Sequence, residues 1–296
     1  MTARAPRPAS FLKAAALAAL LALAACQSAP EPAPEPVEPP PPTVQAAPLE
    51  VLLGTAEVRG HSVYVADMAS GKSLYEENAE ALRFPASLTK MMTLYLLFEA
   101  VETGSLSLND DLPVSTTAAS MPPSKIGLKA GSTIKVRDAA QAMAIKSAND
   151  VAVVVAEALA GSETEFAAQM TARARGLGMQ RTRFVNASGL PDTRQVTTAL
   201  DMAILGRALQ TRYPRFAPYF RAKEFRYNGR TYKATNKLLG KVRGVDGIKT
   251  GYVRMSGYNL VASARRGGRR LIVVVIGGRT GRDRDREVTE LIERYM

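Results

Sequence analysis

The stretch PASLTKMMT, residues 85–93, places a serine three residues before a lysine at the start of an apolar segment. The apolar residues continue to Ala100 and Gly104 follows, which predicts a helix that is buried on nearly all sides. Residues three apart share a helix face, so the amine of Lys90 would lie within reach of the Ser87 hydroxyl. The stretch therefore predicts a central helix of the fold and a serine that a lysine could activate.

The same spacing recurs at Ser10/Lys13 and at Ser132/Lys135, so spacing alone identifies no site. The first pair lies in an N-terminal segment that we expect to be removed. Ser132 lies where a turn meets a short extended segment, and Lys135 need not share its face. From this stretch alone, Ser87 could equally well be the N-cap of its helix.

The periodicity of the apolar residues predicts strands near both ends of the folded part and helices between them. Strands are predicted at residues 61–68, 72–75, 224–227, 230–233, 247–252, 258–264 and 271–276. Helices are predicted at residues 136–145, 149–159, 162–175, 198–209 and 288–295. We expect an α/β fold of the α+β type, with one sheet assembled from both ends of the domain, flanking helices and an inserted all-helical lobe. A cleft between sheet and lobe is the expected place for a site.

The first 25 residues resemble a bacterial lipoprotein signal peptide. They combine three cations with an Ala/Leu segment at residues 14–25, which is shorter than the roughly 20 residues that span a membrane. The sequence LAAC at residues 23–26 resembles a lipobox, which predicts lipidation of Cys26 and a membrane anchor on the periplasmic face of the envelope. Ordinary cleavage after Ala22-Leu23-Ala24 is the alternative. Cys26 is the only cysteine, so no disulfide is expected.

Residues 26–48 are rich in proline and carry three glutamates, which predicts an extended tether. The three cations of residues 1–25 balance these acids, so residues 49–296 carry the whole formal charge of +12. Such a charge suits an anionic neighbour. Export argues against nucleic acid and leaves the cell wall or anionic lipid, although any single arginine patch is more simply a solvated surface.

Histidine is nearly absent from the chain. His61, at the start of the first predicted strand, is the only one, so a Ser-His-Asp triad would require it to face a serine. Catalytic zinc usually takes two or three histidines, so we expect no metal and no cofactor. Any nucleophile would use a lysine as its base, with a pKa lowered by burial or by a second cation.

Two further motifs favour Ser87 as that nucleophile. Ser147-Ala148-Asn149 lies between two predicted helices, and Lys249-Thr250-Gly251 lies in a late strand. Together with S-x-x-K, in this order, they resemble the motifs of the penicilloyl serine transferases. The chain looks most similar to the low-molecular-weight penicillin-binding proteins that act as D-alanyl-D-alanine carboxypeptidases. The likeness extends over KSANDVAVVVAEALAGSE (146–163), NASGL (186–190), DMAILGRAL (201–209), VDGIKTGY (245–252), SGYNLVASA (256–264) and GGRT (277–280).

The resemblance implies a β-lactamase/transpeptidase-like fold with an antiparallel sheet, and it implies catalytic roles for three residues. Ser87 would be the acyl-enzyme nucleophile and Lys90 its general base. Ser147 would pass a proton to the leaving D-alanine. The N–H groups of Ser87 and Tyr252 would form the oxyanion hole.

The resemblance also implies substrate-binding roles. Asn149 would hold the substrate amide, and Thr250 would bind the substrate carboxylate. Lys249 would help to steer that carboxylate and would keep Lys90 deprotonated. Gly251 would let the substrate lie close to the backbone.

The sequence departs from the family at two places. Tyr252 stands where the family often has histidine, but only its backbone is needed. Some relatives place an arginine beside the K-T-G strand to bind the carboxylate, and Thr235 stands there in this chain. Arg279 or Arg282 could substitute for it.

The function that the resemblance implies is removal of the terminal D-alanine from peptidoglycan stem pentapeptides during cell-wall biogenesis, with β-lactams as covalent inhibitors. We expect residues 49–296 to form this catalytic domain, without a C-terminal β domain. The alternatives are a D,D-endopeptidase, a serine β-lactamase and a non-catalytic wall-binding lipoprotein. Class A β-lactamases deacylate through a glutamate, and no E-x-x-L-N stretch follows Ser147. We therefore predict that penicillin acylates Ser87 and leaves slowly.

Overall fold

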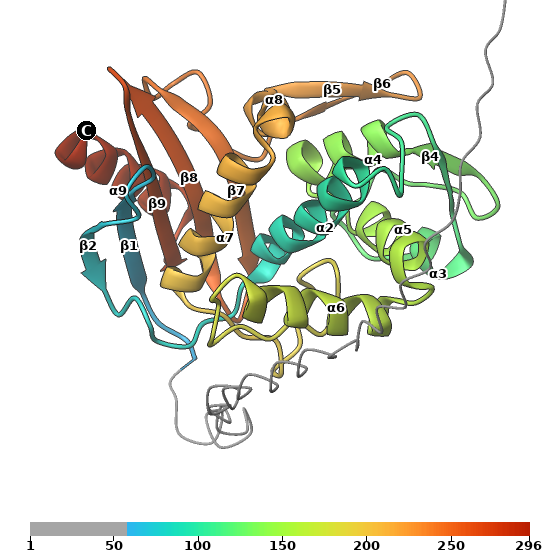
Figure 1. Cartoon of the computed structure of the whole chain (residues 1–296), viewed down its shortest axis with the longest axis horizontal. Coiled ribbons are helices and arrows are strands. Elements are labelled where there is room, and N and C mark those ends of the chain that lie inside the picture. Colours follow the sequence, from blue (N-terminus) through green and yellow to red (C-terminus); the bar gives the residue numbers. More distant parts are fainter. Residues whose placement is uncertain (1–57) are drawn as a thin grey trace, which may run out of the picture. The chain divides into compact units, whose positions relative to one another are not determined.

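A computed structural model describes residues 58–296 of the chain (Figure 1). The predicted signal segment, the lipidated Cys26 and the tether at residues 26–48 lie outside the described residues and stay predictions. Within residues 58–296, no helix has the length and apolar character that crossing a membrane requires.

A five-stranded antiparallel sheet in the order β2-β1-β9-β8-β7 forms one side of the domain (Figure 1). The strands are β1 (Ser62–Asp67), β2 (Ser73–Glu77), β7 (Val245–Val253), β8 (Gly257–Arg266) and β9 (Arg269–Gly278). The pairing of β1 with β9, with Val63 opposite Val275, joins the two ends of the domain. The predicted sheet built from both ends is therefore confirmed.

Helices cover both faces of this sheet, which explains the uninterrupted apolar residues of β9. Ile272 and Val274 belong to the core shared with α7 (Ala199–Arg212). Val273 and Val275 belong to the core shared with α9 (Gly281–Tyr295). Because successive strand residues point to opposite faces, each face of β9 meets a helix.

The predicted central helix is confirmed with one correction at its start. Helix α2 (Lys90–Glu102) has no side chain more than 9% exposed from Lys90 to Phe98. Residues Ala86–Thr89 form a 3₁₀ turn, η1, and not the first turn of the α-helix. The N–H of Leu88 donates to the carbonyl of Pro85 (3.2 Å), the i to i+3 bond that tightens this entry.

Helices of the inserted lobe pack around α2 (Figure 1). The lobe contains α3 (Thr116–Ser120), α4 (Val136–Gln141), a π-helical turn (Ala142–Lys146), α5 (Asn149–Ala160), α6 (Glu163–Gly176) and the short strands β3 (Asp111–Pro113) and β4 (Thr133–Lys135). The hydroxyl of Ser162 accepts the N–H of Glu165 (3.1 Å) at the start of α6. The predicted helical insertion is therefore confirmed, but it is not all-helical, because β3 and β4 pair as a two-stranded sheet.

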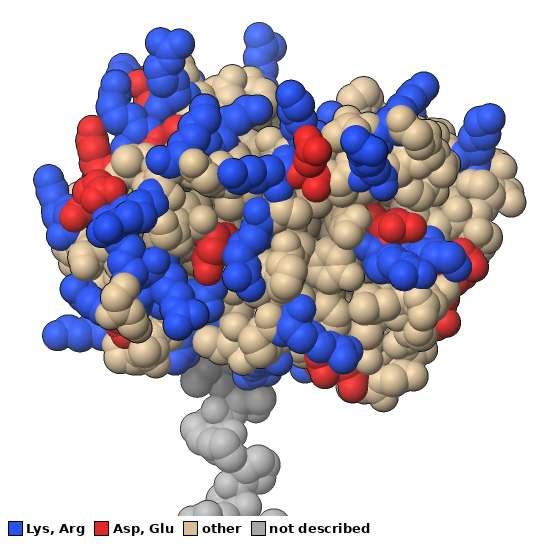
Figure 2. All heavy atoms as spheres, turned by 90° about the horizontal axis from the view of Figure 1, so that it is seen from above, with Lys and Arg blue, Asp and Glu red and all other residues tan. Residues whose placement is uncertain are grey.

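Between α7 and β7, the chain forms a 3₁₀ turn (Pro214–Phe216), α8 (Ala217–Arg221) and the predicted hairpin of β5 (Glu224–Tyr227) and β6 (Arg230–Lys233). Seen from the side of this hairpin, lysine and arginine side chains are spread over the surface and outnumber the acids (Figure 2). This distribution agrees with the excess of 39 Lys and Arg over 27 Asp and Glu.

Helix α9 begins seven residues before the predicted start at Val288. Its first two turns, GRDRDRE, have no apolar stripe from which a helix could be predicted. They form because the hydroxyl of Thr280 accepts the N–H of Asp283 (3.0 Å) as an N-cap. The guanidinium of Arg284 is also buried there, donating to the carbonyl oxygen of Asn259 (2.6 Å).

Candidate active site

Ser87 lies on the 3₁₀ turn that leads into α2, and strands β7 and β8 hold this turn. The side chain of Asn259 on β8 donates to the carbonyl oxygens of Phe84 and Pro85 (both 3.2 Å). A Cβ atom added at Gly251 of β7 would lie 3.2 Å from the Ser87 nitrogen. Only a glycine lets β7 approach this closely, so the Gly251 backbone runs directly beside the turn.

Lys90 is fully buried one turn after Ser87, and its hydrogen bonds match a neutral amine. Its Nζ donates to Asn149 Oδ1 (2.7 Å) and to the carbonyl oxygen of Ser188 (2.5 Å). The same Nζ lies 3.3 Å from Ser87 Oγ. A neutral amine has two N–H groups and one lone pair. In the neutral form, the two carbonyl-type oxygens accept both N–H groups, which leaves the lone pair for the serine hydroxyl.

The surroundings of Lys90 lower its pKa well below the ordinary value. Burial is the main cause, because it disfavours the charged form, and the positive charge of Lys249 adds to it. The carboxylates of Asp150 and Glu163 act in the opposite direction. The net lowering of the pKa favours the neutral form of the amine, which can accept a proton.

Both carboxylates also hold segments around the site. Asp150 accepts the N–H groups of Gly127 (2.9 Å) and Leu128 (3.1 Å). Glu163 accepts the N–H of Ala187 (2.9 Å), which fixes the loop that carries the Ser188 carbonyl. Neither these carboxylates nor a backbone carbonyl belongs to the three motifs, so the sequence reasoning missed all of them as site residues.

Ser147 lies between the π-helical turn and α5, with the left-handed φ of 65°. The buried Lys249 Nζ donates to Ser147 Oγ (2.9 Å) and to the carbonyl oxygen of Thr250 (2.9 Å). Burial, with a smaller effect of the Arg284 charge, lowers the pKa of Lys249 to about 7. The lysine of the K-T-G motif, Lys249, is therefore hydrogen-bonded to Ser147, the first residue of the S-x-N motif.

Asn149 bonds to the S-x-x-K lysine at the other end of the same motif. Its Oδ1 accepts from Lys90, and its Nδ2 donates to the carbonyl oxygen of Pro122 (2.9 Å). Nδ2 has a second N–H group, so the geometry is compatible with the predicted contact to a substrate amide. The contact with substrate stays a prediction, whereas the hydrogen bond by which Asn149 positions the Lys90 amine is present in the structure.

A cleft of about 620 Å³ opens at the Ser87 hydroxyl. Residues from all three motifs line it, together with Ser124, Lys146, Thr235, Lys237, Lys241, Tyr258 and the start of α9. The hydroxyl of Thr250 donates to that of Thr235 (2.7 Å). The ring of Tyr252 is 53% exposed and packs on Tyr258 with centroids 4.3 Å apart. Hydroxyl and ammonium side chains and the rings of Tyr252 and Tyr258 thus line the cleft.

The two arginines that could replace the missing carboxylate ligand are separated by the structure. Arg282 lines the cleft, whereas Arg279 lines a different cavity beside His61. Lys237 and Lys241 also line the cleft, and sequence reasoning missed them. Their only signal was their position around Thr235 in the stretch KATNKLLGK.

The other candidate residues lie away from the nucleophile. His61 contacts Glu77 and Glu287 (both 3.0 Å) at the start of β1, as an ordinary strand-end residue. Lys135 pairs with Asp111 (3.0 Å), and the Ser132 hydroxyl donates to a backbone carbonyl. Among residues 58–296, no group of three or more His, Cys, Asp or Glu side chains is placed to hold a metal ion.

Three short motifs from distant parts of the chain thus meet in one cleft, an arrangement that defines the penicilloyl serine transferases. The chain belongs to the D-alanyl-D-alanine carboxypeptidase family, peptidase S11, whose sequence profile matches residues 48–280. The resemblance inferred from the motifs is therefore confirmed.

Two curated relatives are the D-alanyl-D-alanine carboxypeptidases DacF of Bacillus subtilis and DacA of Escherichia coli K12. DacF is 36% identical over 237 residues and DacA is 37% identical over 246 residues, which cover 78% and 81% of this chain. The chain spans 61% of the length of each relative.

Solved structures show the same fold. Penicillin-binding protein D2 from Listeria monocytogenes, in its cefotaxime-bound form, is 34% identical and superimposes with a TM-score of 0.72. The match covers 78% of this chain and 95% of that protein. The predicted β-lactamase/transpeptidase-like fold is confirmed.

Proposed function

We propose that this chain is a serine-type D-alanyl-D-alanine carboxypeptidase, which removes the terminal D-alanine from peptidoglycan stem pentapeptides. One observation carries the proposal. The buried Lys90 has both N–H groups of its neutral form bonded to oxygen acceptors, and its third contact is the Ser87 hydroxyl. The family to which the chain belongs supports the same reaction.

In the first half of the reaction, Lys90 Nζ takes the proton of Ser87 Oγ, and Oγ attacks the carbonyl carbon of the penultimate D-alanine. The N–H groups of Ser87 and Tyr252 hold the resulting oxyanion. Collapse of this intermediate breaks the C–N bond and leaves the acyl chain on Oγ. Ser147 gives its proton to the departing amine and takes one from Lys249, to which it is hydrogen-bonded. The proton that Lys90 took from Ser87 passes to Lys249, so Lys90 is neutral again.

In the second half, water hydrolyses the acyl-enzyme. Neutral Lys90 takes a proton from the attacking water and returns it to Ser87 Oγ as the acyl–oxygen bond breaks, which restores the serine hydroxyl. β-Lactams enter by the same acylation and stay on Ser87, because no class A deacylating glutamate motif follows Ser147.

Substrate binding in this proposal uses the cationic side of the cleft. Thr250 and Lys249 bind the C-terminal carboxylate, and Arg282 supplies the charge that Thr235 does not. Asn149 holds the substrate amide. Recognition of the rest of the stem peptide decides between carboxypeptidase and D,D-endopeptidase activity, since both reactions use the same residues.

The proposed location is the bacterial envelope. A lipid on Cys26 holds the chain at the membrane on its periplasmic face, and the tether at residues 26–48 spans the distance to the wall. The basic charge of residues 49–296 favours an anionic surface of this kind. A Cys26→Ala variant should appear in the soluble fraction and should lack the added fatty acid by mass spectrometry.

The test of activity uses the purified chain with pentapeptide muropeptides and with crosslinked dimers, and follows the products by mass. We expect loss of one D-alanine from the pentapeptide and covalent labelling by fluorescent penicillin. Ser87→Ala should abolish both, whereas Ser132→Ala, in an S-x-x-K outside the cleft, should change neither. If the dimers are cut and the pentapeptide is not, the chain is an endopeptidase. If penicillin is hydrolysed with rapid turnover, it is a β-lactamase. No turnover and no labelling would support the non-catalytic wall-binding reading.

A further inference from the structure

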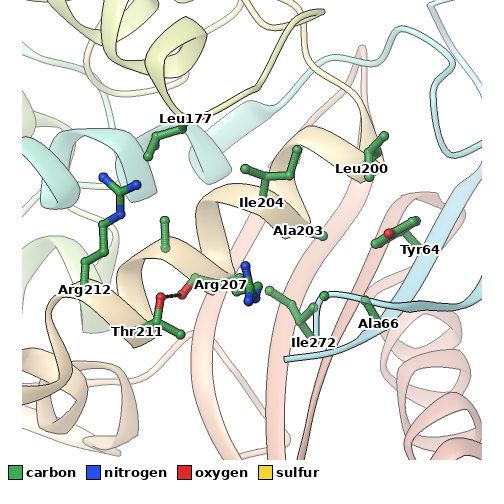
Figure 3. A pocket seen from close by; sticks show the side chains of 12 residues that line it. Tyr64, Ala66, Leu177, Leu200, Ala203, Ile204, Arg207, Thr211, Arg212 and Ile272 are labelled. Atoms are coloured by element: carbon green, nitrogen blue, oxygen red, sulfur yellow. Dashed lines mark hydrogen bonds between the residues drawn. The ribbon is translucent and has the colours of Figure 1, made fainter. Parts of the chain in front are cut away.

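A second cavity, of about 240 Å³, lies against α7 on the side of β1 and β9 (Figure 3). It shares no lining residue with the catalytic cleft. Its apolar part comes from α7, from the end of α6 and from the sheet: Leu177, Leu200, Ile204, Ile272 and the ring of Tyr64. Such a surface can bind a compact apolar group by removing it from water.

Two arginines of α7, Arg207 and Arg212, border this apolar surface (Figure 3). Arg207 donates from Nε to the carbonyl oxygen of Met68 (2.8 Å) and from Nη2 to that of Ala69 (3.1 Å). Arg212 donates from Nη1 to the hydroxyl of the buried Tyr95 (3.0 Å). Neutral acceptors thus hold the Arg207 guanidinium by two hydrogen bonds and that of the exposed Arg212 by one.

Neither guanidinium is neutralised by a carboxylate of the part of the chain that the structure describes. Within residues 58–296, Arg207 and Arg212 form no ion pair, whereas Arg270 pairs with Asp246 (2.8 Å) and Arg266 with Glu293 (2.6 Å). A guanidinium has five N–H donors, and the hydrogen bonds above use two of Arg207 and one of Arg212. Donors and positive charge are therefore available at the edge of an apolar hollow.

We propose that this cavity is a binding site for a small amphipathic carboxylate, whose charged end contacts Arg207 and Arg212 and whose apolar end fills the hollow. The guanidinium fork matches carboxylate geometry, and charge-assisted hydrogen bonds of this kind are the strong ones. The volume suits a short chain with one anionic group. The site is separate from the proposed reaction at Ser87.

The probe is sodium octanoate, titrated into the purified chain by calorimetry. Octan-1-ol supplies the same chain without charge, and acetate supplies the charge without the chain. We expect saturable one-to-one binding of octanoate, and affinities for the other two that are weaker by about tenfold or more, because each lacks one of the two contacts.

Five variants locate the site. Arg207→Gln and Arg212→Gln should each weaken octanoate binding by about tenfold. Ala203→Leu, which fills the hollow and leaves both charges, should abolish it. Arg215→Gln, next to the cavity in sequence but paired with Glu102, should bind as the unchanged chain does. Arg282→Gln, in the catalytic cleft, should also bind normally.

Melting curves accompany each titration, since Arg207 holds the β1–β2 turn. If Arg207→Gln lowers the melting temperature, Arg212→Gln and Ala203→Leu decide the outcome. The proposal is overturned if octanoate fails to bind, or if these two variants bind it as well as the unchanged chain. It is also overturned if phenyl phosphate binds at this cavity more tightly than octanoate, because the ligand class would then be wrong.

Discussion

Lys90 and Lys249 hold opposite ends of one motif, and burial together with the positive charge of Lys249 lowers the pKa of Lys90. Lys249 donates to Ser147, while Lys90 donates to Asn149 two residues later. This arrangement gives the S-x-N segment a structural task besides any contact with substrate. It holds the two buried lysine amines in place, and the charge of Lys249 adds to the effect of burial, which favours the neutral form of Lys90.

The first prediction concerns the pH dependence of acylation. The pKa of Lys249 is about 7, so its charge is present at lower pH and is lost as the pH rises through that value. Lys249 must keep its proton to bind the carboxylate, whereas Lys90 must lose its proton to act as a base. We expect the rate constant for penicillin acylation of Ser87 to follow a bell-shaped pH profile with an alkaline limb near pH 7.

A Lys249→Arg variant tests the origin of that limb. Arginine keeps its charge throughout the range, so the alkaline limb should vanish between pH 6 and about 9 while the acid limb remains. Stopped-flow fluorescence with labelled penicillin gives the rate, and circular dichroism confirms folding. An identical alkaline limb in both proteins would rule out Lys249 as its source.

The second prediction concerns Glu163, whose carboxylate raises the pKa of Lys90 and accepts the N–H of Ala187. Glu163→Gln removes the charge and keeps an oxygen for that N–H. The pKa of Lys90 should then fall further, and the acid limb of the profile should move to lower pH. Glu163→Leu removes the hydrogen bond as well, so acylation should slow at every pH. The prediction fails if both variants have the same acid limb as the unchanged chain.

Residues with periodic patterns or known motifs could be predicted from the sequence. Residues that act through the backbone could not, nor could the carboxylates of Asp150 and Glu163, which lie outside the motifs. The strands of the five-stranded sheet and the helices α5, α6 and α7 followed from periodicity, whereas the short elements α3, β3 and β4 were not predicted. The Ser188 carbonyl, which accepts from Lys90, leaves no trace in side-chain identity. The 3₁₀ turn at Ser87 also escaped prediction, because the stretch reads as a continuous helix and its entry depends on contacts with β7 and β8.

The third prediction concerns the close approach of β7 to the nucleophile. In Gly251→Ala, the new Cβ would lie 3.1 Å from the Pro85 oxygen and 3.2 Å from the Ser87 nitrogen, so the turn must shift. We expect acylation to slow by about a hundredfold, since small misplacements of a reacting group are costly. Gly176→Ala is the matched control, because nothing lies within 4 Å of its added Cβ. Equal acylation rates in the two variants would contradict the prediction.

The fourth prediction concerns His61, whose hydrogen bond to Glu287, with a smaller one to Glu77, raises its pKa to about 9. Because folding raises the pKa, the protonated form of His61 stabilises the fold. This contribution is complete below the unfolded pKa of about 6.5 and is lost as the pH rises through about 9. The side chain is partly exposed, so solvent screening reduces the contribution to about 1 kcal/mol. Urea unfolding at pH 6 should therefore show His61→Gln to be less stable by this amount. The difference should disappear by about pH 10, and a constant difference would contradict the assignment.

The fifth prediction concerns the carboxylate ligand and compares two arginines three residues apart. Arg282 lines the catalytic cleft and Arg279 does not. If Arg282 contacts the substrate carboxylate, Arg282→Gln should lower kcat/KM for a D-Ala-D-Ala peptide by about tenfold or more, as expected for the loss of a charged hydrogen bond. Arg279→Gln should stay within about twofold of the unchanged chain. A peptide ending in an amide should be processed equally by all three proteins, because it offers no carboxylate to bind. If Arg282→Gln slows both peptides alike, the residue maintains the shape of the cleft, and Lys237 or Lys241 becomes the candidate for the missing charge.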